Sequence, residues 1–257
     1  MQRPGESNRL LARLKKKKPM KKNLTIALIV LFILSGIRLF AQDGLIKENR
    51  PVSSFSAIKV GGIAHVYLTQ AETEKVDVEV SNKEFNDRLI IEVVNDVLVV
   101  RMKPNENGKG QNYGNVKVRI NVSYKNLNKI DASGVTHVYG ESLIESEKFD
   151  ILVSGVSNVK LNVKANEVNI AGSGTSNITL SGNAKVLNAK TSGVSNIKAY
   201  DFSAEEVTSE SSGASNIYIT ATKTITAKAS GASNVNYKGD AKVDYNKSSS
   251  AARIRKM

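Results

Sequence analysis

Between residues 126 and 246, apolar side chains recur at every second position, and a short polar motif interrupts them at regular intervals. A period of two places successive side chains on opposite faces of an extended chain, so it predicts β-strands rather than helices. The motif is Ser-Gly-x-Ser/Thr-Asn/His, with steps of 21, 19, 19, 20 and 18 residues between its glycines, Gly134, Gly155, Gly174, Gly193, Gly213 and Gly231. Such a period is typical of stacked repeats that bury their apolar sides against their neighbours. The pattern predicts an all-β protein with a parallel β-helix, or β-solenoid, of roughly 18–21 residues per repeat.

The positions around each glycine predict which side chains face the interior. Aliphatic residues such as Ile151 and Val159 lie four before and four after a motif glycine, with small residues between them. If the alternation continues through the motif, its Gly and second Ser point inward, whereas its first Ser and its Asn point outward. We therefore expect the glycine to lie where backbones crowd the axis of the helix, since larger residues do not fit there.

The outward positions form the candidate binding face. Parallel strands stacked about 4.8 Å apart place equivalent residues directly above one another, so each Asn amide can donate to the Asn of the next turn. Two tyrosines share a further outward position, five residues after a motif glycine. The candidate residues are Ser133, His137, Tyr139, Asn158, Asn177, Asn196, Asn216, Tyr218 and Asn234.

The region from residue 52 to residue 125 also alternates with a period of two. Around Gly62 the apolar positions match those of the repeat, and His65 takes the position of the Asn, which makes a seventh, degenerate copy. Asn95 and Asp96 lie between two apolar runs and predict a hairpin turn. The pattern leaves open whether this region forms early turns of the solenoid or a separate β layer.

Several segments together resemble a known family. Residues 55–60, 66–70, 116–122 and 127–130, followed by the serial Ser-Gly-x-Ser-Asn motifs, are similar to the GIN head-domain family of bacterial autotransporter-type adhesins. The resemblance extends from about residue 52 to residue 245. It implies a parallel β-helix, in agreement with the period, and a role in adhesion, and it brings no catalytic residues.

Residues 1–41 have the features of an upstream extension followed by a signal peptide that begins at Met20. Two lysines follow Met20, residues 24–34 contain Thr25 as their only non-apolar member, and residues 39–41 suit cleavage after Ala41. The apolar run is shorter than the roughly 20 residues that span a bilayer, which favours a cleaved signal over an anchor. We expect export to the periplasm, the cell surface or the exterior, with no integral membrane span in the mature chain.

The net charge of +13 is concentrated in this leader. Residues 1–41 hold ten Lys/Arg and one Glu, so the remaining chain carries 27 Lys/Arg against 23 Asp/Glu. The basic composition therefore does not indicate a nucleic-acid partner. We interpret residues 247–257 as a basic, flexible tail.

The residue types that catalysis and metal binding need are scarce. The chain has no cysteine, and its two histidines, His65 and His137, both occupy the Asn position, where a structural role is the simpler interpretation. Asp150, Glu167 and Asp201 share no position in the repeat, whereas a polysaccharide-active β-helix would need clustered carboxylates. The turns also lack the Asp residues of calcium-binding β-rolls. We expect no catalytic residue, metal or cofactor, and an enzyme is the least favoured alternative.

Two functions remain. The chain is either a surface binding module that presents repetitive polar rows to an extracellular glycan or surface protein, or a structural protein whose ladders only stabilise the solenoid. In the second case the exposed end turn would pair with another copy to form a homo-oligomer.

Overall fold

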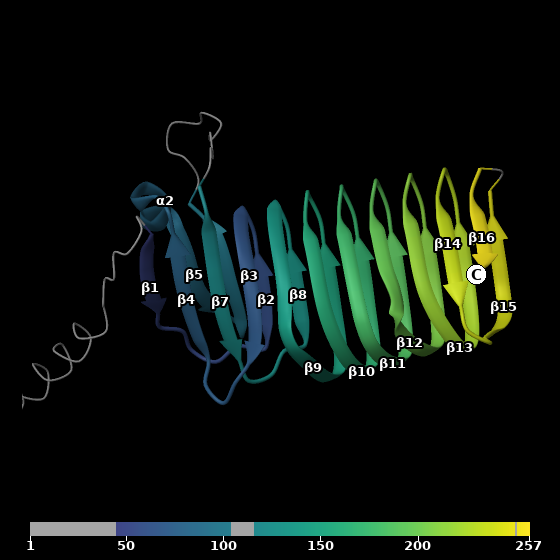
Figure 1. Cartoon of the computed structure of the whole chain (residues 1–257), viewed down its shortest axis with the longest axis horizontal. Coiled ribbons are helices and arrows are strands. Elements are labelled where there is room, and N and C mark those ends of the chain that lie inside the picture. Colours follow the sequence, from purple (N-terminus) through teal and green to yellow (C-terminus); the bar gives the residue numbers. More distant parts are fainter. Residues whose placement is uncertain (1–44, 104–115, 250) are drawn as a thin grey trace, which may run out of the picture. The chain divides into compact units, whose positions relative to one another are not determined.

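The computed structural model describes residues 45–103, 116–249 and 251–257, so the predicted extension and signal peptide lie outside the described residues. Nearly all elements of this part are strands (Figure 1). The helix is α2 (Lys83–Arg88), and the strands are β1 (Ile46–Arg50), β2 (Ala57–Val60), β3 (Ile63–Gln70), β4 (Lys75–Val80), β5 (Leu89–Val94), β6 (Val97–Met102), β7 (Val118–Tyr124), β8 (Lys129–Ala132), β9 (Val135–Val153), β10 (Asn158–Gly172), β11 (Asn177–Thr191), β12 (Asn196–Ser211), β13 (Asn216–Ala229), β14 (Asn234–Lys238), β15 (Lys242–Ser248) and β16 (Arg253–Lys256).

Strands β9 to β13 each form most of one turn of a parallel β-solenoid (Figure 1). Neighbouring turns pair in parallel, with the motif residue Asn177 opposite Asn158 on one side and opposite Asn196 on the other. The solenoid has about 7 turns with a spacing of about 19 residues. The predicted parallel β-helix is therefore confirmed.

Each turn has two faces and two edges. We call the segments that follow a Ser-Gly-x-Ser turn, such as residues 158–161, the Asn face, and those that lead into one, such as residues 167–172, the groove face. The Ser-Gly-x-Ser turns form the tight-turn edge, and residues such as 162–166 form the opposite bend. Aliphatic side chains fill the space between the faces, and one complete row is almost fully buried: Val138, Val159, Ile178, Ile197, Ile217 and Val235.

The motif glycines lie at the exposed tips of the tight turns, so the prediction that they face the axis is wrong. Their φ angles lie between 69° and 81°, a left-handed conformation that favours glycine. The tips also stack closely: the Thr175 N–H donates to the Gly155 carbonyl at 2.8 Å. A Cβ on Gly174 would lie 2.7 Å from that same oxygen. The glycine is needed because neighbouring turns approach each other, not because the interior is narrow.

The second Ser of each motif, which is Thr136 in the first copy, points inward, as predicted, and in four of the six copies it closes the turn. The Ser195 side chain is buried, and its hydroxyl donates to the Ser192 carbonyl at 2.8 Å. The same bond joins Ser157 to Ser154 at 2.8 Å. The second-serine hydroxyl thus bonds the carbonyl of the first serine, three residues earlier, which the tight turn would otherwise leave without a hydrogen-bond donor.

The region before the motifs joins the same solenoid. Strand β3 pairs in parallel with β7 and β9, and β2 pairs in parallel with β6 and β8. Strands β1, β4 and β5 pair antiparallel at this end. The predicted hairpin turn is confirmed, since Asn95 and Asp96 have φ angles of 50° and 61° between β5 and β6. The sequence pattern did not predict α2, which begins where the Asn82 side chain accepts from the Phe85 N–H.

The C-terminal residues extend the solenoid rather than forming a flexible tail. Strand β15 pairs in parallel with β13, and β16 pairs in parallel with β14. Ala252 is buried one position before Arg253, which lies opposite Asn234. Arg253 therefore occupies the Asn position of a further turn whose motif has lost its glycine.

Candidate functional site

The outward Asn residues from Asn177 to Asn234 form a hydrogen-bonded ladder along the Asn face. Asn196 Nδ2 donates to Asn177 Oδ1 at 3.2 Å, Asn216 Nδ2 to Asn196 Oδ1 at 2.9 Å, and Asn234 Nδ2 to Asn216 Oδ1 at 2.9 Å. These side chains are half-buried. Because an amide carries two N–H donors and two acceptor lone pairs, the ladder leaves each interior Asn one donor and one lone pair for a partner.

The ladder continues into aromatic side chains at the β3 end. The rings of His65 and His137 stack with centroids 4.5 Å apart, and those of Tyr67 and Tyr139 with centroids 5.3 Å apart. The guanidinium of Arg119, from β7, lies 3.9 Å from the centre of the Tyr67 ring. We call these five residues the aromatic end. The repeat predicted the positions of both histidines. Tyr67 was not among the predicted residues, although it lies five residues after Gly62, as Tyr139 does after Gly134.

The aromatic end favours the neutral form of the His65 imidazole. Burial, followed by the positive charges of His137 and Arg119, lowers the pKa of His65. Around His137, the Nδ1 atom lies 3.5 Å from both the Tyr139 Oη and the Asn158 Nδ2. His137 therefore links the imidazole stack to Asn158, which lies opposite Asn177 at the start of the ladder.

The structure separates the two predicted tyrosines. Tyr139 lies on β9 and Tyr218 on β13, with β10, β11 and β12 between them. Tyr218 instead meets Tyr200 edge-on, with centroids 5.4 Å apart, and Lys238 Nζ lies 4.4 Å from the centre of the Tyr200 ring. The remaining predicted residue, Ser133, is half-buried and donates its hydroxyl to the Val60 carbonyl at 3.2 Å.

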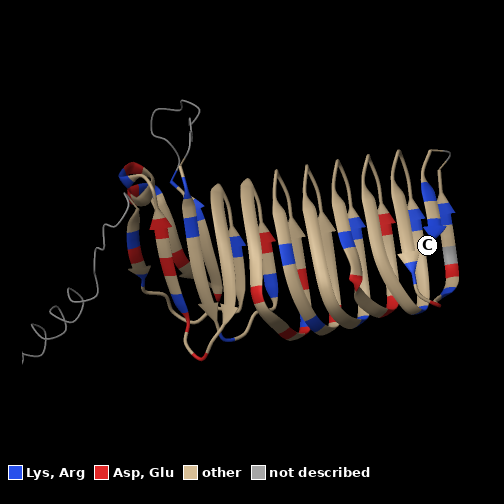
Figure 2. Cartoon of the chain, viewed as in Figure 1, with Lys and Arg blue, Asp and Glu red and all other residues tan. Residues whose placement is uncertain are grey.

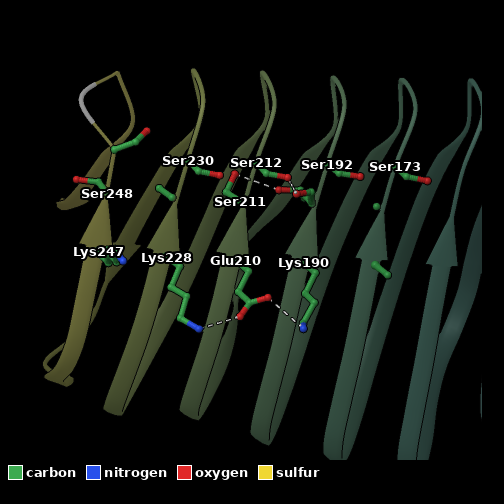
Figure 3. Close-up of a pocket in the computed structure, with 15 residues that line it drawn as sticks. Ser173, Lys190, Ser192, Glu210, Ser211, Ser212, Lys228, Ser230, Lys247 and Ser248 are labelled. Carbon is green, nitrogen blue, oxygen red and sulfur yellow. Dashed lines mark hydrogen bonds and ion pairs between the residues drawn. The ribbon is translucent and has the colours of Figure 1, made fainter.

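A groove of about 640 Å³ lies on the groove face beside the tight turns (Figure 3). The first serines of successive motifs line its upper part: Ser173, Ser192, Ser212 and Ser230. Below them, Glu210 forms ion pairs with Lys190 at 3.1 Å and Lys228 at 3.3 Å (Figure 3). Hydrogen bonds from these two lysines lower the pKa of the Glu210 carboxyl. Lys247 also lines the groove, so three lysines face one carboxylate and the groove keeps a net positive charge.

The groove face also carries a polar network that the sequence analysis missed. Asn188 Nδ2 donates to Asn169 Oδ1 at 2.9 Å, and Asn169 Nδ2 donates to Asp150 Oδ1 and to Glu167 Oε1, both at 2.9 Å. Lys148 and Asn169 lower the pKa of Glu167 by hydrogen bonding. Asp150 and Glu167 therefore share one amide despite their different positions in the repeat. The network could have been predicted from the sequence, because Asp150, Asn169 and Asn188 each lie five residues before a motif glycine.

Charges cover the strands and the opposite bend, whereas the Ser-Gly-x-Ser tips carry none (Figure 2). A second hollow, of about 720 Å³, lies at the opposite bend, where Lys164 pairs with Glu145 at 3.0 Å. Among the described residues, no group of three or more His, Cys, Asp or Glu side chains is placed to hold a metal ion. None of the helices in residues 45–103, 116–249 and 251–257 is long and apolar enough to cross a membrane.

The fold is shared with solved bacterial proteins. A "putative adhesin" from Bacteroides fragilis is similar with a TM-score of 0.76 and 23% identity, over 84% of this chain and 98% of its own. A "putative adhesin" from Parabacteroides merdae has a TM-score of 0.60 and 20% identity, with 84% and 98% coverage. A "putative lipid binding protein" from Parabacteroides distasonis has a TM-score of 0.62 and 16% identity, with 83% and 98% coverage. At these identities the likeness shows the fold alone.

No curated protein matches the sequence. The family model described as "Putative auto-transporter adhesin, head GIN domain" matches residues 54–241, which include β2 to β14 and every copy of the motif. The predicted resemblance is confirmed, and the chain belongs to this family.

Proposed function

We propose that the protein is an exported, non-catalytic binding module of the cell envelope or cell surface, and that its Asn face holds a glycan or another surface protein. The Asn ladder is the observation that carries this proposal. It presents identical, half-exposed amides in register on successive turns, and each interior amide keeps one donor and one acceptor unused. Sugar hydroxyls and peptide groups both donate and accept, so a row of amides suits either.

Membership of an adhesin family supports this role. The groove face is a weaker candidate, because Lys148, Lys190 and Lys228 already pair with glutamates. The predicted signal peptide supports export. Catalysis is not favoured, because Asp150 and Glu167 are held by the Asn169 amide and, for Glu167, by Lys148.

The alternative of a purely structural protein that polymerises through its end turn is less well supported. Strand β16 lies at the end of the strand order and presents Arg253, Arg255 and Lys256. Charged side chains on an edge strand oppose pairing with a second edge. In a homo-oligomer in which β16 pairs with the β16 of a second copy, these like charges would meet.

The test is a glycan array and a surface-protein pull-down with the whole chain and the double variant Asn177→Ala/Asn196→Ala. We expect the variant to lose binding while its Tm falls by only a few degrees. The matched control is Asn169→Ala/Asn188→Ala, which removes two amides of the groove face and should bind like the parent. If the parent binds no glycan or protein, and the Asn177/Asn196 variant only lowers the Tm, the structural alternative is correct.

A further inference from the structure

We propose that the Asn face binds a linear acidic polysaccharide, with its carboxylate or sulfate groups held by a line of unpaired basic side chains along the solenoid axis. This inference rests on the proposed function and names the class of ligand. It comes from two rows of outward side chains, three and five residues after the motif glycines, which follow the strand pairing from β7 through β3 and β9–β14 to β16.

The first row runs from one arginine to another across the Asn ladder. In register order it consists of Arg119, His65, His137, Asn158, Asn177, Asn196, Asn216, Asn234 and Arg253. The second row lies beside it and consists of Asn121, Tyr67, Tyr139, Lys160, Thr179, Lys198, Tyr218, Asn236 and Arg255. Neither row contains an aspartate or a glutamate.

The basic side chains of these rows are available to a ligand. Arg119, Lys160, Lys198, Arg253 and Arg255 are all exposed, and none forms an ion pair with the described residues. Arg119 lies over the Tyr67 ring and donates to the Asn121 side-chain oxygen at 3.1 Å. The groove face differs, because Lys148 pairs with Glu167, and Lys190 and Lys228 both pair with Glu210. The rows of the Asn face thus hold five basic side chains without an ion pair among the described residues, whereas the groove has three lysines (Lys190, Lys228 and Lys247) against one glutamate.

Carboxylates that border the rows have partners of their own. On β4, Glu79 lies opposite Arg119 and forms an ion pair with Lys47 at 3.4 Å, and Asp77 lies opposite Asn121 and forms an ion pair with Lys75 at 2.7 Å. Glu141, two positions beyond Tyr139, accepts a hydrogen bond from the Thr69 hydroxyl at 3.2 Å. Between Arg119 and Arg253 the two rows therefore contain only basic and uncharged side chains.

The spacing of the charges favours a polysaccharide over a nucleic acid. At about 4.8 Å per turn, Lys160 and Lys198 lie about 10 Å apart, and the outer arginines lie about 14 Å further along on either side. Duplex DNA carries one negative charge per about 1.7 Å of its axis, which this sparse line cannot match. An acidic polysaccharide combines widely spaced anions with many hydroxyls, and the amide and tyrosine edges between the cations can bond those hydroxyls.

The test measures binding of the full chain to immobilised polygalacturonate, dextran sulfate, neutral dextran and duplex DNA. We expect binding to one or both acidic polysaccharides, and the first two arms show whether carboxylate or sulfate is preferred. The variant Lys160→Gln/Lys198→Gln should weaken that binding by about fivefold to tenfold, as expected for two lost exposed ion pairs. The matched control Lys190→Gln/Lys228→Gln should leave it unchanged.

Three outcomes overturn the inference: no binding to either acidic polysaccharide, equal losses in the two lysine variants, or tighter binding to DNA. If a neutral glycan or a protein instead binds, and only Asn177→Ala/Asn196→Ala abolishes it, the inference fails and the proposed function stands. If the chain binds no glycan and no protein in any assay, both fail.

Discussion

At the tight-turn edge every turn from Gly134 to Gly231 closes with the same backbone, whereas at the opposite bend the turns differ in length. Three of the four strand pairs between β9 and β13 contain a register irregularity, and each lies near the opposite bend, as between Thr179 and Ser181. At both edges the chain passes from one face to the other. The motif is therefore needed at the tight-turn edge, whereas the differences in repeat length are accommodated at the opposite bend.

The difference has a physical cause. The tight turn reverses the chain within a few residues, so it needs a left-handed residue, a close contact with the next turn and a hydroxyl to satisfy a carbonyl. The opposite bend spreads the reversal over several residues that remain extended and hydrogen-bonded. A looser bend accepts an extra residue as a bulge, with little cost to the pairing on either side.

The largest effect is expected for Gly174→Val. A β-branched residue is strained at a φ of 70°, and its Cβ would lie 2.7 Å from the Gly155 carbonyl oxygen. We expect the free energy of unfolding to fall by about 3 kcal/mol, measured by urea denaturation. The adjacent control is Thr175→Val, an exposed position that holds Val in other turns, and it should change stability very little. Equal stability of the two variants would show that the glycine conformation is not required.

A smaller loss is expected for Ser195→Ala. The change removes a buried hydroxyl that donates to the Ser192 carbonyl at 2.8 Å and lies 3.2 Å from the Ser176 hydroxyl. We expect a loss of about 1 kcal/mol in the free energy of unfolding. Ser192→Ala, at the exposed first serine of the same motif, is the matched control and should be almost neutral. If Ser192→Ala lowers the free energy of unfolding more than Ser195→Ala does, the second serine is not the residue that closes the turn.

The sequence predicted the fold, the inward second Ser and the Asn row, because each repeats in register many times. It failed for the motif glycine because alternation does not continue through a left-handed residue: Gly174 and Thr175 both point out. It missed the last turn because Ala252 and Arg253 replace the Ser and Asn of the motif. A single altered copy cannot be recognised from its residues alone. It can be recognised only from its position, about one repeat of 19 residues after the motif of Gly231.

The aromatic end needed information that no local pattern contains. His65 and His137 are far apart in the sequence, and they stack because β3 pairs with β9. Arg119 reaches Tyr67 because β7 pairs with the other side of β3. The alternation predicted each strand, but the order β7–β3–β9 depends on long connections whose course the sequence does not fix. The unpaired charges of the Asn face became visible only once this order placed them in two rows.

The smallest effect is expected from an insertion at the opposite bend. One Gly inserted after Thr222 adds to a segment where the pairing of β12 with β13 is already irregular between Ala204 and Glu206. Thr222 and Lys223 are both exposed, so the extra residue can form a bulge without moving the buried rows. We expect a change of less than about 0.5 kcal/mol in the free energy of unfolding. The same insertion after Gly213, at the tight-turn edge of the same turn, should be far more damaging because it displaces Ser215 from the interior. If the two insertions cost the same, the edges are equivalent, and the motif has some other role than closing the turn.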